Sequence, residues 1–452
     1  MRVLLLRPFY GANVHSEAHG DLGIYEINNS YYPDLVFINA ATILSRHSDY
    51  DTTVIDAMAE RISPLSIIKS IECYFDEIII KATAPTIQSD LQFCRMIHEK
   101  FPKTKIYIAG HIAKIIKKWI YKNCNYIYDV IEEPLDFYVY KKINNVSSCK
   151  LDDLPTPDYT VIPYEKYRNS NDYLLLTMQT SRGCPMQCGY CPYNSFYGSK
   201  IDCRSTSKVA ADLEALLKLN PSAIQFRDQY FTYDKKRIAE LCDIIISKNL
   251  KFNWTCETRI DDLDFKTIDL MKKAGLQQIS FGIESANDEI LKGYNRKCSK
   301  IDLYKSIIEY LHSCEISTLA FYIIGFPEDD WSSVEKTYSL ALELNTTLAK
   351  FSAFEPCVIL DENKEITPEL FVPFDNSMNI ETKSKLSKEA IEYIVELYTH
   401  NYYYHNNSLK NLYEISHLCQ KRQEYVRNTL SQYATDISSL SEIVDKLKYV
   451  EV

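Results

Sequence analysis

Three cysteines of this 452-residue chain lie within a single short segment. Cys184, Cys188 and Cys191 have the spacing C-x3-C-x2-C and directly follow a predicted β-strand over residues 174–180. Three thiolates at this spacing can bind three irons of a cubane iron–sulfur cluster, whose complete ligation by protein needs four. The fourth iron then stays open to another molecule. The spacing therefore predicts a reactive [4Fe-4S] cluster.

The same thiols leave a structural zinc site open as an alternative. Zinc commonly binds four thiolates, and Cys203 would be the fourth. Zinc ribbons usually pair two short C-x2-C knuckles, however, and this segment contains only one such pair. The spacing therefore favours the iron–sulfur cluster over zinc, and over thiols that are simply buried.

The composition argues against several classes of protein. The chain has 51 Lys and Arg residues and 61 Asp and Glu residues, and this net charge of −10 argues against binding along a nucleic-acid backbone. No apolar run reaches the ~18 residues that span a bilayer. Arg7 interrupts the opening apolar run, which is predicted as a strand rather than a signal peptide. The 14 cysteines are therefore expected to be mostly reduced thiols in a cytoplasmic protein.

Short β-branched runs alternate with helix-length segments over residues 1–150. This alternation predicts βαβ units and a doubly wound parallel sheet. The segment Pro33–His47 is predicted as one of its amphipathic helices. Ligands of such sheets bind beyond the carboxyl ends of the strands, where this chain has Thr83 and Gly110. The predicted strands are Arg2–Arg7, Thr52–Ile55, Glu77–Ala82, Lys105–Ala109 and Tyr126–Ile131.

Residues 151–172 are predicted to be a linker, because two prolines and three aspartates near their start disfavour helix and central strand. Six further βα units over residues 173–356 predict a partial (β/α)6 barrel, whose active site lies on the loops after the strands. Residues 357–452 predict an α-helical extension. The six predicted strands are Leu174–Thr180, Ala223–Arg227, Phe252–Glu257, Gln278–Glu284, Thr318–Gly325 and Lys350–Phe354.

The cysteine segment, with the aromatic Tyr190 directly before its last cysteine, resembles the radical S-adenosylmethionine (SAM) superfamily. The resemblance covers residues 174–356. It implies a [4Fe-4S] cluster whose open iron is chelated by the amino and carboxylate groups of SAM. One-electron reduction then releases methionine and a 5′-deoxyadenosyl radical. Tyr190 is implied to contact the cofactor.

Four segments at predicted strand ends also resemble this superfamily. Phe226–Phe231 resembles the F-x-D-x-x-F segment, which implies that Asp228 lies near the methionine amino group. Trp254–Arg259 resembles the W-x-x-x-x-R segment, which implies that Arg259 meets a carboxylate or phosphate.

The remaining two segments imply contacts with the nucleoside part of SAM. Gly282–Ser285 resembles the G-x-E-S segment, in which Glu284 and Ser285 contact the ribose and carboxylate. Gly325 and Glu328 belong to a G-x-P-E-like segment that lies beside adenine. An ordinary strand–loop junction with capping carboxylates is the alternative for each segment taken alone.

The N-terminal region is similar to the cobalamin-binding class of the same superfamily, on Pro33-Asp34-Leu35, Asp56 and the bridge 154–158. The class implies that Thr83 and Gly110 contact a corrinoid that carries a methyl group to an unreactive carbon or phosphorus. The chain departs from the class pattern, since it has only four glycines before residue 150 and no D-x-H-x-x-G motif. Cobalamin therefore stays an open prediction beside a domain that has no cofactor.

Three other side chains are open between a chemical and a structural role. Cys357 follows the sixth predicted strand and is predicted to donate a hydrogen atom or take part in methyl transfer, with a small buried thiol as the alternative. Cys256 faces the same choice. His111 is predicted to be an ordinary loop histidine rather than a ligand.

The predicted function is that of a radical SAM enzyme acting on a small metabolite or natural-product intermediate, with cobalamin-dependent methyl transfer as the first reaction. A dehydratase, epimerase, oxidase or cyclase is the alternative. Transfer-RNA methylthiolation is a third interpretation, disfavoured because the other cysteines are scattered and the chain is acidic, and a noncatalytic metal-binding or electron-transfer module is a fourth. The resemblance implies an electron donor such as flavodoxin or ferredoxin. Neither nucleic acid nor a membrane is expected as a partner.

Overall fold

The structure, a computed structural model, describes residues 1–26, 32–169, 172–297, 300–355, 366–378 and 384–405. The chain divides into two compact units. The first contains residues 1–229 and 356–379, and the second contains residues 230–355 and 380–452. Both units are built from parallel strands and helices, which confirms the predicted α/β fold class.

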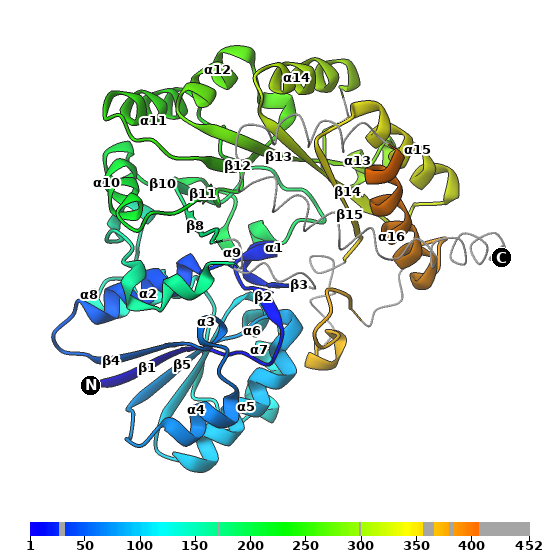
Figure 1. The fold of residues 1–452 in the computed structure, drawn as a ribbon. Coiled ribbons are helices and arrows are strands. Elements are labelled where there is room, and N and C mark those ends of the chain that lie inside the picture. The colour runs from blue at the N-terminus through cyan, green and yellow to red at the C-terminus, as the bar shows by residue number, and fades with distance from the viewer. Residues whose placement is uncertain (27–31, 170–171, 298–299, 356–365, 379–383, 406–452) are drawn as a thin grey trace. The chain divides into compact units, whose positions relative to one another are not determined.

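The first unit contains a five-stranded parallel sheet in the order β4-β1-β5-β6-β7 (Figure 1). The sheet is doubly wound, with α2 and α8 on one face and α4 and α5 on the other. Its central strands are continuous apolar runs because helices cover both faces. The strands are β1 (Arg2–Arg7), β4 (Asp51–Asp56), β5 (Glu77–Lys81), β6 (Lys105–Ala109) and β7 (Asp129–Ile131). The helices are α3 (Ala57–Glu60), α4 (Pro64–Ser70), α5 (Ile87–Lys100), α6 (His111–Ile115), α7 (Lys117–Asn123) and α8 (Leu135–Asn144).

Helix α2 (Leu35–Ser45) differs from the predicted amphipathic helix. Residues 35–44 are all buried, because α2 packs against α8 and also against the short turn η3 (Tyr159–Val161). The polar positions that made the segment look amphipathic are inside the protein. Asn39, for example, donates to the Asp136 carboxylate at 3.0 Å.

A small hairpin follows β1 that the sequence pattern did not predict. It consists of β2 (Asn13–His15) and β3 (Ile24–Glu26), which pair antiparallel, and of the turn α1 (Ala18–Asp21) between them. Inside α1, His19, Gly20 and Asp21 have φ values of 49°, 62° and 69°. Such left-handed backbone is rare for residues with a side chain and persists only where neighbouring contacts hold it.

The remainder of the first unit carries the cysteine segment. Strands β8 (Leu175–Met178) and β11 (Ala223–Phe226) pair in parallel, and β9 (Ser181–Arg182) pairs antiparallel with β10 (Asp202–Cys203). The helices here are α9 (Tyr193–Tyr197) and α10 (Thr206–Leu217). The predicted linker begins with the 3-10 turns η2 (Leu151–Asp153), η3 and η4 (Tyr164–Tyr167).

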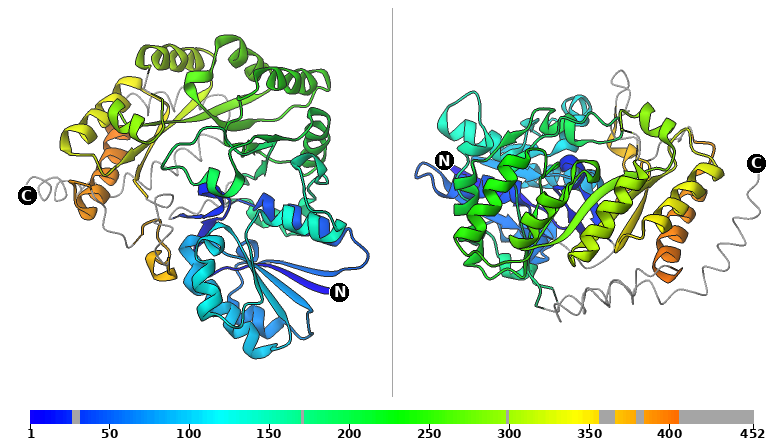
Figure 2. Two further views of the ribbon diagram at one scale, coloured as in Figure 1. Left: turned by 180° about the vertical axis from the view of Figure 1, so that it is seen from behind. Right: turned by 90° about the horizontal axis from the view of Figure 1, so that it is seen from above.

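The second unit contains four parallel strands in the order β12-β13-β14-β15. With β8 and β11, all six strands predicted after residue 172 are present. Figure 2 shows helices α11, α12, α14 and α15 side by side. The strands are β12 (Trp254–Thr258), β13 (Leu276–Glu284), β14 (Ser317–Ile324) and β15 (Leu348–Ala353). The helices are α11 (Lys235–Ser247), α12 (Phe265–Lys273), α13 (Asp288–Gly293), α14 (Ile301–Ser313), α15 (Trp331–Leu344) and α16 (Lys388–His405).

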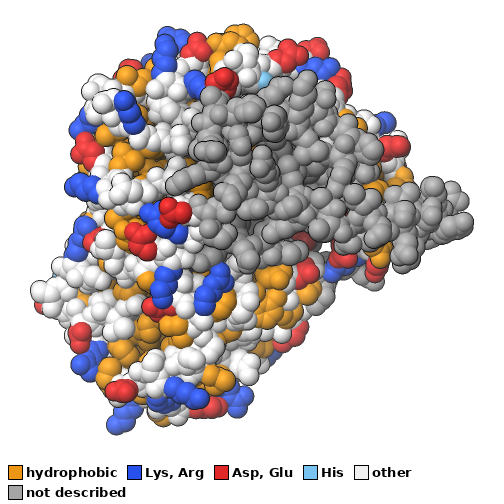
Figure 3. Space-filling view, viewed as in Figure 1, with side chains coloured by type: hydrophobic (Ala, Val, Ile, Leu, Met, Phe, Trp, Pro, Cys, Tyr) orange, Lys and Arg blue, Asp and Glu red, His pale blue; other side chains and the backbone are white. Residues whose placement is uncertain are grey.

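Helix α16 is the described part of the predicted C-terminal helical extension. It packs against β15 and α15 within the second unit. None of the described helices is long and apolar enough to cross a membrane. On the described part of the face drawn in Figure 3, lysine and arginine side chains are interspersed with acidic ones.

Candidate functional site

The three predicted ligand cysteines lie on one loop, residues 183–201, which we call the cluster loop. Strands β9 and β10 close it at the base, where Arg182 pairs with Asp202 and Ser181 pairs with Cys203. Each residue of these pairs is fixed by the backbone ladder, so both ends of the loop start from a defined position.

The loop is folded tightly around its cysteines. The amide of Cys191 donates to the carbonyl of Cys188 at 3.0 Å, so the C-x2-C pair forms a single turn. The amide of Cys184 donates to the carbonyl of Gly198 at 3.2 Å. Cys188 is buried, whereas Cys184 and Cys191 are partly exposed. The loop thus presents thiols near the surface, as a cluster with an open iron needs.

Among the residues that the structure describes, no three His, Cys, Asp or Glu side chains converge on one point. The thiolates of a cubane bind different irons and need no such convergence. Cys203, the fourth ligand of the zinc alternative, is an exposed residue of β10.

Gly183 begins the cluster loop in a conformation that other residues rarely adopt. Its φ is +95°, and a Cβ atom there would lie 2.2 Å from the carbonyl oxygen of Lys200. Only glycine allows the two arms of the loop to approach this closely. Close packing of the loop therefore requires glycine at residue 183, whether or not a cofactor binds.

Asp228 lies two residues after the end of β11 and is fully buried. Its carboxylate accepts hydrogen bonds from the Thr180 amide at 2.7 Å, the Thr180 hydroxyl at 2.6 Å and the Ser181 hydroxyl at 2.6 Å. These residues connect β8 to the cluster loop. The neighbouring Gln229 accepts from the Gly183 amide at 2.9 Å. Asp228 and Gln229 therefore anchor the base of the cluster loop, a contact that the motif comparison did not predict.

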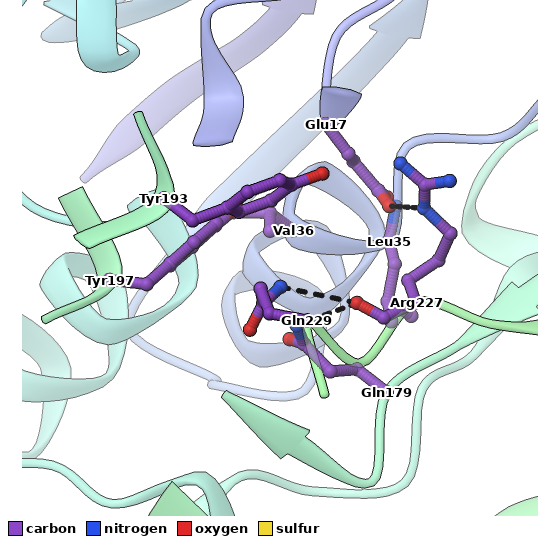
Figure 4. A pocket seen from close by; sticks show the side chains of 8 residues that line it. All are labelled: Glu17, Leu35, Val36, Gln179, Tyr193, Tyr197, Arg227 and Gln229. Atoms are coloured by element: carbon purple, nitrogen blue, oxygen red, sulfur yellow. Dashed lines mark hydrogen bonds and ion pairs between the residues drawn. The ribbon is translucent and has the colours of Figure 1, made fainter. Parts of the chain in front are cut away.

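A polar pocket adjoins the cluster loop through α9 (Figure 4). It encloses about 250 Å³ of empty space, part of which is open to solvent. Nε of Arg227 lies 3.9 Å from a carboxylate oxygen of Glu17, and burial together with Asp34 raises the pKa of Glu17 to about 7. Buried polar groups with shifted pKa values often mark binding sites. The pocket is lined by Glu17, Leu35, Val36, Gln179, Tyr193, Tyr197, Arg227 and Gln229.

The two positions predicted to contact a corrinoid are engaged by the chain itself. The hydroxyl of Thr83 hydrogen-bonds that of Thr86 at 2.7 Å, and Thr86 donates to the buried carboxylate of Asp90 at 2.7 Å. Gly110 has a φ of +124°, and a Cβ atom there would lie 2.4 Å from the carbonyl oxygen of Ala82. Thr83 is therefore engaged in its own turn, and Gly110 allows the backbone at Ala82 to approach closely.

Residues 18–23, which we call the edge segment, cover the carboxyl ends of β5 and β6. The amide of Ala84 donates to the Leu22 carbonyl at 2.6 Å. Lys81, at the end of β5, forms a buried ion pair with Asp21. A Cβ atom on Gly23 would lie 2.7 Å from Cβ of Thr83. The residues at this edge do not fit a corrinoid, because the chain's own backbone and a buried ion pair occupy the place expected for it.

His111 follows Gly110 and uses both nitrogens of its ring. Nδ1 lies 2.9 Å from the Gly20 carbonyl oxygen, and Nε2 lies 2.9 Å from the Ser195 hydroxyl. The ring stacks on Phe196 at 4.9 Å between centroids. Burial lowers the pKa of His111 to about 3, so the ring is neutral at physiological pH. This geometry favours the predicted loop histidine over a metal ligand.

In the second unit, the predicted cofactor residues lie at strand ends. Arg259 follows β12 and donates to both carboxylate oxygens of Asp261, at 2.9 and 2.8 Å. Glu284 ends β13 with a φ of +70°, and its carboxylate lies 3.8 Å from Arg296. A non-glycine residue in this conformation costs about 1–3 kcal/mol, a strain that is common at functional sites. Ser285 is buried and accepts from the Asn287 amide at 3.1 Å.

Gly325 has a φ of +90° and packs closely against Ile391 of α16. A Cβ atom at residue 325 would lie 2.5 Å from Cδ1 of Ile391. Glu328 is exposed and accepts from the Tyr294 hydroxyl at 3.3 Å. The buried Asp329 organises this turn, because it accepts from the amides of Gly325 and Phe326 at 2.9 Å each.

The other predicted side chains have simpler placements. Tyr190 lies in the cluster loop and is half-buried. Cys256 is buried in β12. Cys357 lies outside the described residues. Sequence reasoning missed Glu17, Arg227 and Asp329. Arg227 and Asp329 lie beside a predicted strand end or motif, whereas Glu17 lies beside neither.

Comparisons with known proteins agree with the described fold. Residues 178–341 match the Radical SAM superfamily. An uncharacterized methyltransferase of Pyrococcus horikoshii is 32% identical over 212 residues, which are 46% of this chain and 45% of that protein. The anaerobic magnesium-protoporphyrin IX monomethyl ester cyclase of Rubrivivax gelatinosus is 28% identical over 47% of this chain and 38% of its own length. The chain therefore spans less than half the length of these two relatives.

Among solved structures, the cobalamin-dependent SAM radical enzyme OxsB, with aqua-cobalamin and SAM bound, superposes with a TM-score of 0.63. The superposition covers 75% of this chain and 52% of that one, at 13% identity. A likeness at this identity shows the fold.

Proposed function

Because residues 178–341 match the Radical SAM superfamily, we propose that the chain binds a [4Fe-4S] cluster and cleaves SAM reductively to start a radical reaction. The cluster loop carries this proposal. Its three thiols lie on a tightly turned loop, two of them partly exposed, and Gly183 allows the loop to close. These residues fit the cluster that the family implies.

When bound, the cluster would supply one electron to the sulfonium of SAM. Cys184, Cys188 and Cys191 would hold it, and Tyr190 would lie beside its open side. Asp228 acts on the loop rather than on the reacting atoms, because its carboxylate already accepts three hydrogen bonds from Thr180 and Ser181. We assign it as a positioning residue.

For the predicted residues of the second unit, contacts with SAM are proposed from the resemblance of their own segments. Arg259 would meet a carboxylate, and its fixed pairing with Asp261 holds the guanidinium in one orientation. The strained backbone of Glu284 supports a binding role for that residue and for Ser285. Gly325 and Glu328 would lie beside adenine. Cys357 remains the residue proposed to donate a hydrogen atom or take part in methyl transfer.

The proposed reaction is transfer of a methyl group from SAM to a small molecule, without a bound corrinoid and with flavodoxin or ferredoxin as electron donor. The names of several relatives as methyltransferases support it. The proposed domains are the N-terminal sheet domain (residues 1–150), the linker (151–172), the partial barrel (173–356) and the C-terminal helical extension (357–452). A non-methylating outcome is the second candidate, since the edge segment covers the expected corrinoid position and other relatives are cyclases.

Anaerobic reconstitution with iron and sulfide tests the proposal. The wild type is expected to gain absorbance near ~400 nm and to cleave SAM, as iron–sulfur enzymes of this type do. The triple variant with Cys184, Cys188 and Cys191 replaced by Ala is expected to lose both. Cys203→Ala is the matched control and should keep both. Full SAM cleavage by the triple variant, or loss in the control, would refute the assignment.

Product analysis separates the two outcomes. S-adenosylhomocysteine together with a methylated product indicates methyl transfer. Deoxyadenosine without transfer of a methyl group indicates the second candidate.

A further inference from the structure

Arg182 is the last residue before the cluster loop and is only 2% exposed. Its Nη1 and Nη2 donate to the two carboxylate oxygens of Asp136 at 2.9 and 2.8 Å, and its Nε donates to Gln179 at 2.9 Å. The guanidinium also lies 4.6 Å from the ring centroid of Phe137. A two-point contact of this kind fixes both the position and the plane of the guanidinium.

Asp136 belongs to the N-terminal sheet domain and is itself held in place there. It lies in the first turn of α8, is fully buried and also accepts from the Asn39 side chain of α2 at 3.0 Å. A buried carboxylate left without its cation is strongly unfavourable. Loss of either Arg182 or Asp136 would therefore leave the other as a buried unpaired charge. Their ion pair connects the base of the cluster loop to α8.

A second set of contacts reaches the other arm of the cluster loop. His111 joins the Gly20 carbonyl to the Ser195 hydroxyl, and Ser195 belongs to α9. Nζ of Lys114 donates to the Ser195 carbonyl at 2.8 Å. A Cβ atom on Gly20 would lie 2.9 Å from the carbonyl oxygen of Pro192, the residue directly after Cys191.

The edge segment is thus held from both sides. Its backbone is left-handed at three successive residues, and the buried Asp21–Lys81 pair fixes it on β5. On its opposite side it meets the chain directly after the last cysteine. The expected ligand edge of the sheet is therefore filled by contacts that lead to the cluster loop.

We propose that the carboxyl edge of the N-terminal sheet is a clasp for the cluster loop and not a corrinoid site. The clasp consists of the Arg182–Asp136 and His111–Ser195 contacts. These are positioning residues, because they touch the loop and not the reacting atoms. The inference rests on the proposed function in one respect, since it concerns the loop that is proposed to bind the cluster.

The clasp has a direct consequence for the loop. Outer contacts that orient metal ligands typically change metal affinity by ~10–100-fold when they are removed. They also alter the redox and magnetic properties of an iron–sulfur cluster, which depend on hydrogen bonding and exposure. Loss of the clasp is therefore expected to speed iron release and to change the spectrum of the reduced cluster.

The first test uses the full chain without iron. Amide hydrogen exchange of residues 183–201 is expected to become ~10-fold faster or more in Arg182→Met and Asp136→Asn, because local opening of the loop costs less free energy. Arg182→Lys keeps the charge and should recover part of the protection. Ile268→Ala, at a buried position of α12, is the control that loses stability away from the loop.

The second test uses the reconstituted protein. The Arg182 and Asp136 variants should release iron to a chelator ~10–100-fold faster than wild type and show an altered electron paramagnetic resonance signal. The Ile268 control should match wild type in both measurements. Asp136→Asn preserves shape, so it serves if Arg182→Met does not fold. Variants that melt earlier but match wild type in exchange and iron release would overturn the clasp.

Equilibrium dialysis with hydroxocobalamin provides an independent test. The proposal expects no stoichiometric binding by the wild type, and retention of one equivalent would overturn it. A wild type that takes up no cluster would refute the proposed function instead, while the exchange and dialysis results would still decide the clasp.

Discussion

Substitution of Asp228 by Asn tests whether a single buried carboxylate anchors the cluster loop. The side chain keeps its size and loses its charge. Asp228 accepts from one amide and two hydroxyls, all at 2.6–2.7 Å, and is fully buried. An asparagine oxygen can serve one side of this arrangement, but its NH2 group must then face a donor on the other side.

The magnitude follows from this mismatch. A hydrogen bond to a charged group contributes about 1.5–3 kcal/mol, and a buried donor left unsatisfied costs about 1–3 kcal/mol. The hydroxyls of Thr180 and Ser181 can rotate, which recovers part of the loss. We expect Asp228→Asn to reduce the free energy of unfolding by about 3 kcal/mol. At ~2–4 °C per kcal/mol, the midpoint of thermal unfolding should fall by about 6–12 °C.

The assay is thermal unfolding of the iron-free protein, followed by iron content after reconstitution. Asp234→Asn is the matched control, because Asp234 is an exposed N-cap of α11 and Asn caps helices about as well as Asp. The control should lie within about 0.5 kcal/mol of wild type. If Asp228→Asn melts within ~2 °C of wild type and binds as much iron, the anchoring argument is wrong.

Three further predictions concern the backbone and the titrating groups of the first unit. Gly183→Ala should lower the midpoint of thermal unfolding more than Gly198→Ala does. Both glycines have a positive φ, but only a Cβ atom at residue 183 meets a backbone oxygen. Equal decreases of the midpoint would contradict the packing argument. Burial lowers the pKa of His111 to about 3, so the unfolded chain takes up the proton at a higher pH than the folded chain does. The free energy of unfolding of the wild type should therefore fall as the pH drops from about 6.5 toward 3, by up to about 1.4 kcal/mol per pH unit. Urea unfolding of His111→Gln should lack this dependence. Burial raises the pKa of Asp90 to about 7, so its contribution is complete below about pH 4 and is lost as pH rises through 7, a decline that Asp90→Asn should not show.

The strands were predictable because their signal is local. Val3 to Leu6 and Ile78 to Ile80 are apolar without interruption, as strands covered on both faces must be. The cysteine spacing was equally local, and the loop that carries it lies where the pattern indicated. Strand ends were less certain: the last predicted strand of the N-terminal sheet, Tyr126–Ile131, is only Asp129–Ile131.

The hairpin after β1 gave no such signal. Its two strands have three residues each, and the turn between them depends on left-handed backbone at His19 and Asp21 as well as at Gly20. Propensity disfavours this conformation at the two residues that have side chains. Contacts made by residues far along the chain, such as Lys81 and His111, stabilise it. These contacts join residues that are about 60 and 90 positions apart in the sequence, so a local sequence pattern cannot reveal them.

The same reasoning applies to Arg182, whose importance appears only when the fold brings Asp136 to it across 46 residues. An arginine before a metal-binding loop looks like a solvated cation. Once buried, it needs a counter-charge, and the described partner comes from α8 of the sheet domain. A barrel without that domain would have to expose Arg182 or leave its charge unpaired, and either change would alter the base of the cluster loop. The N-terminal domain therefore helps to hold the base of the cluster loop, whether or not a cofactor binds to that domain.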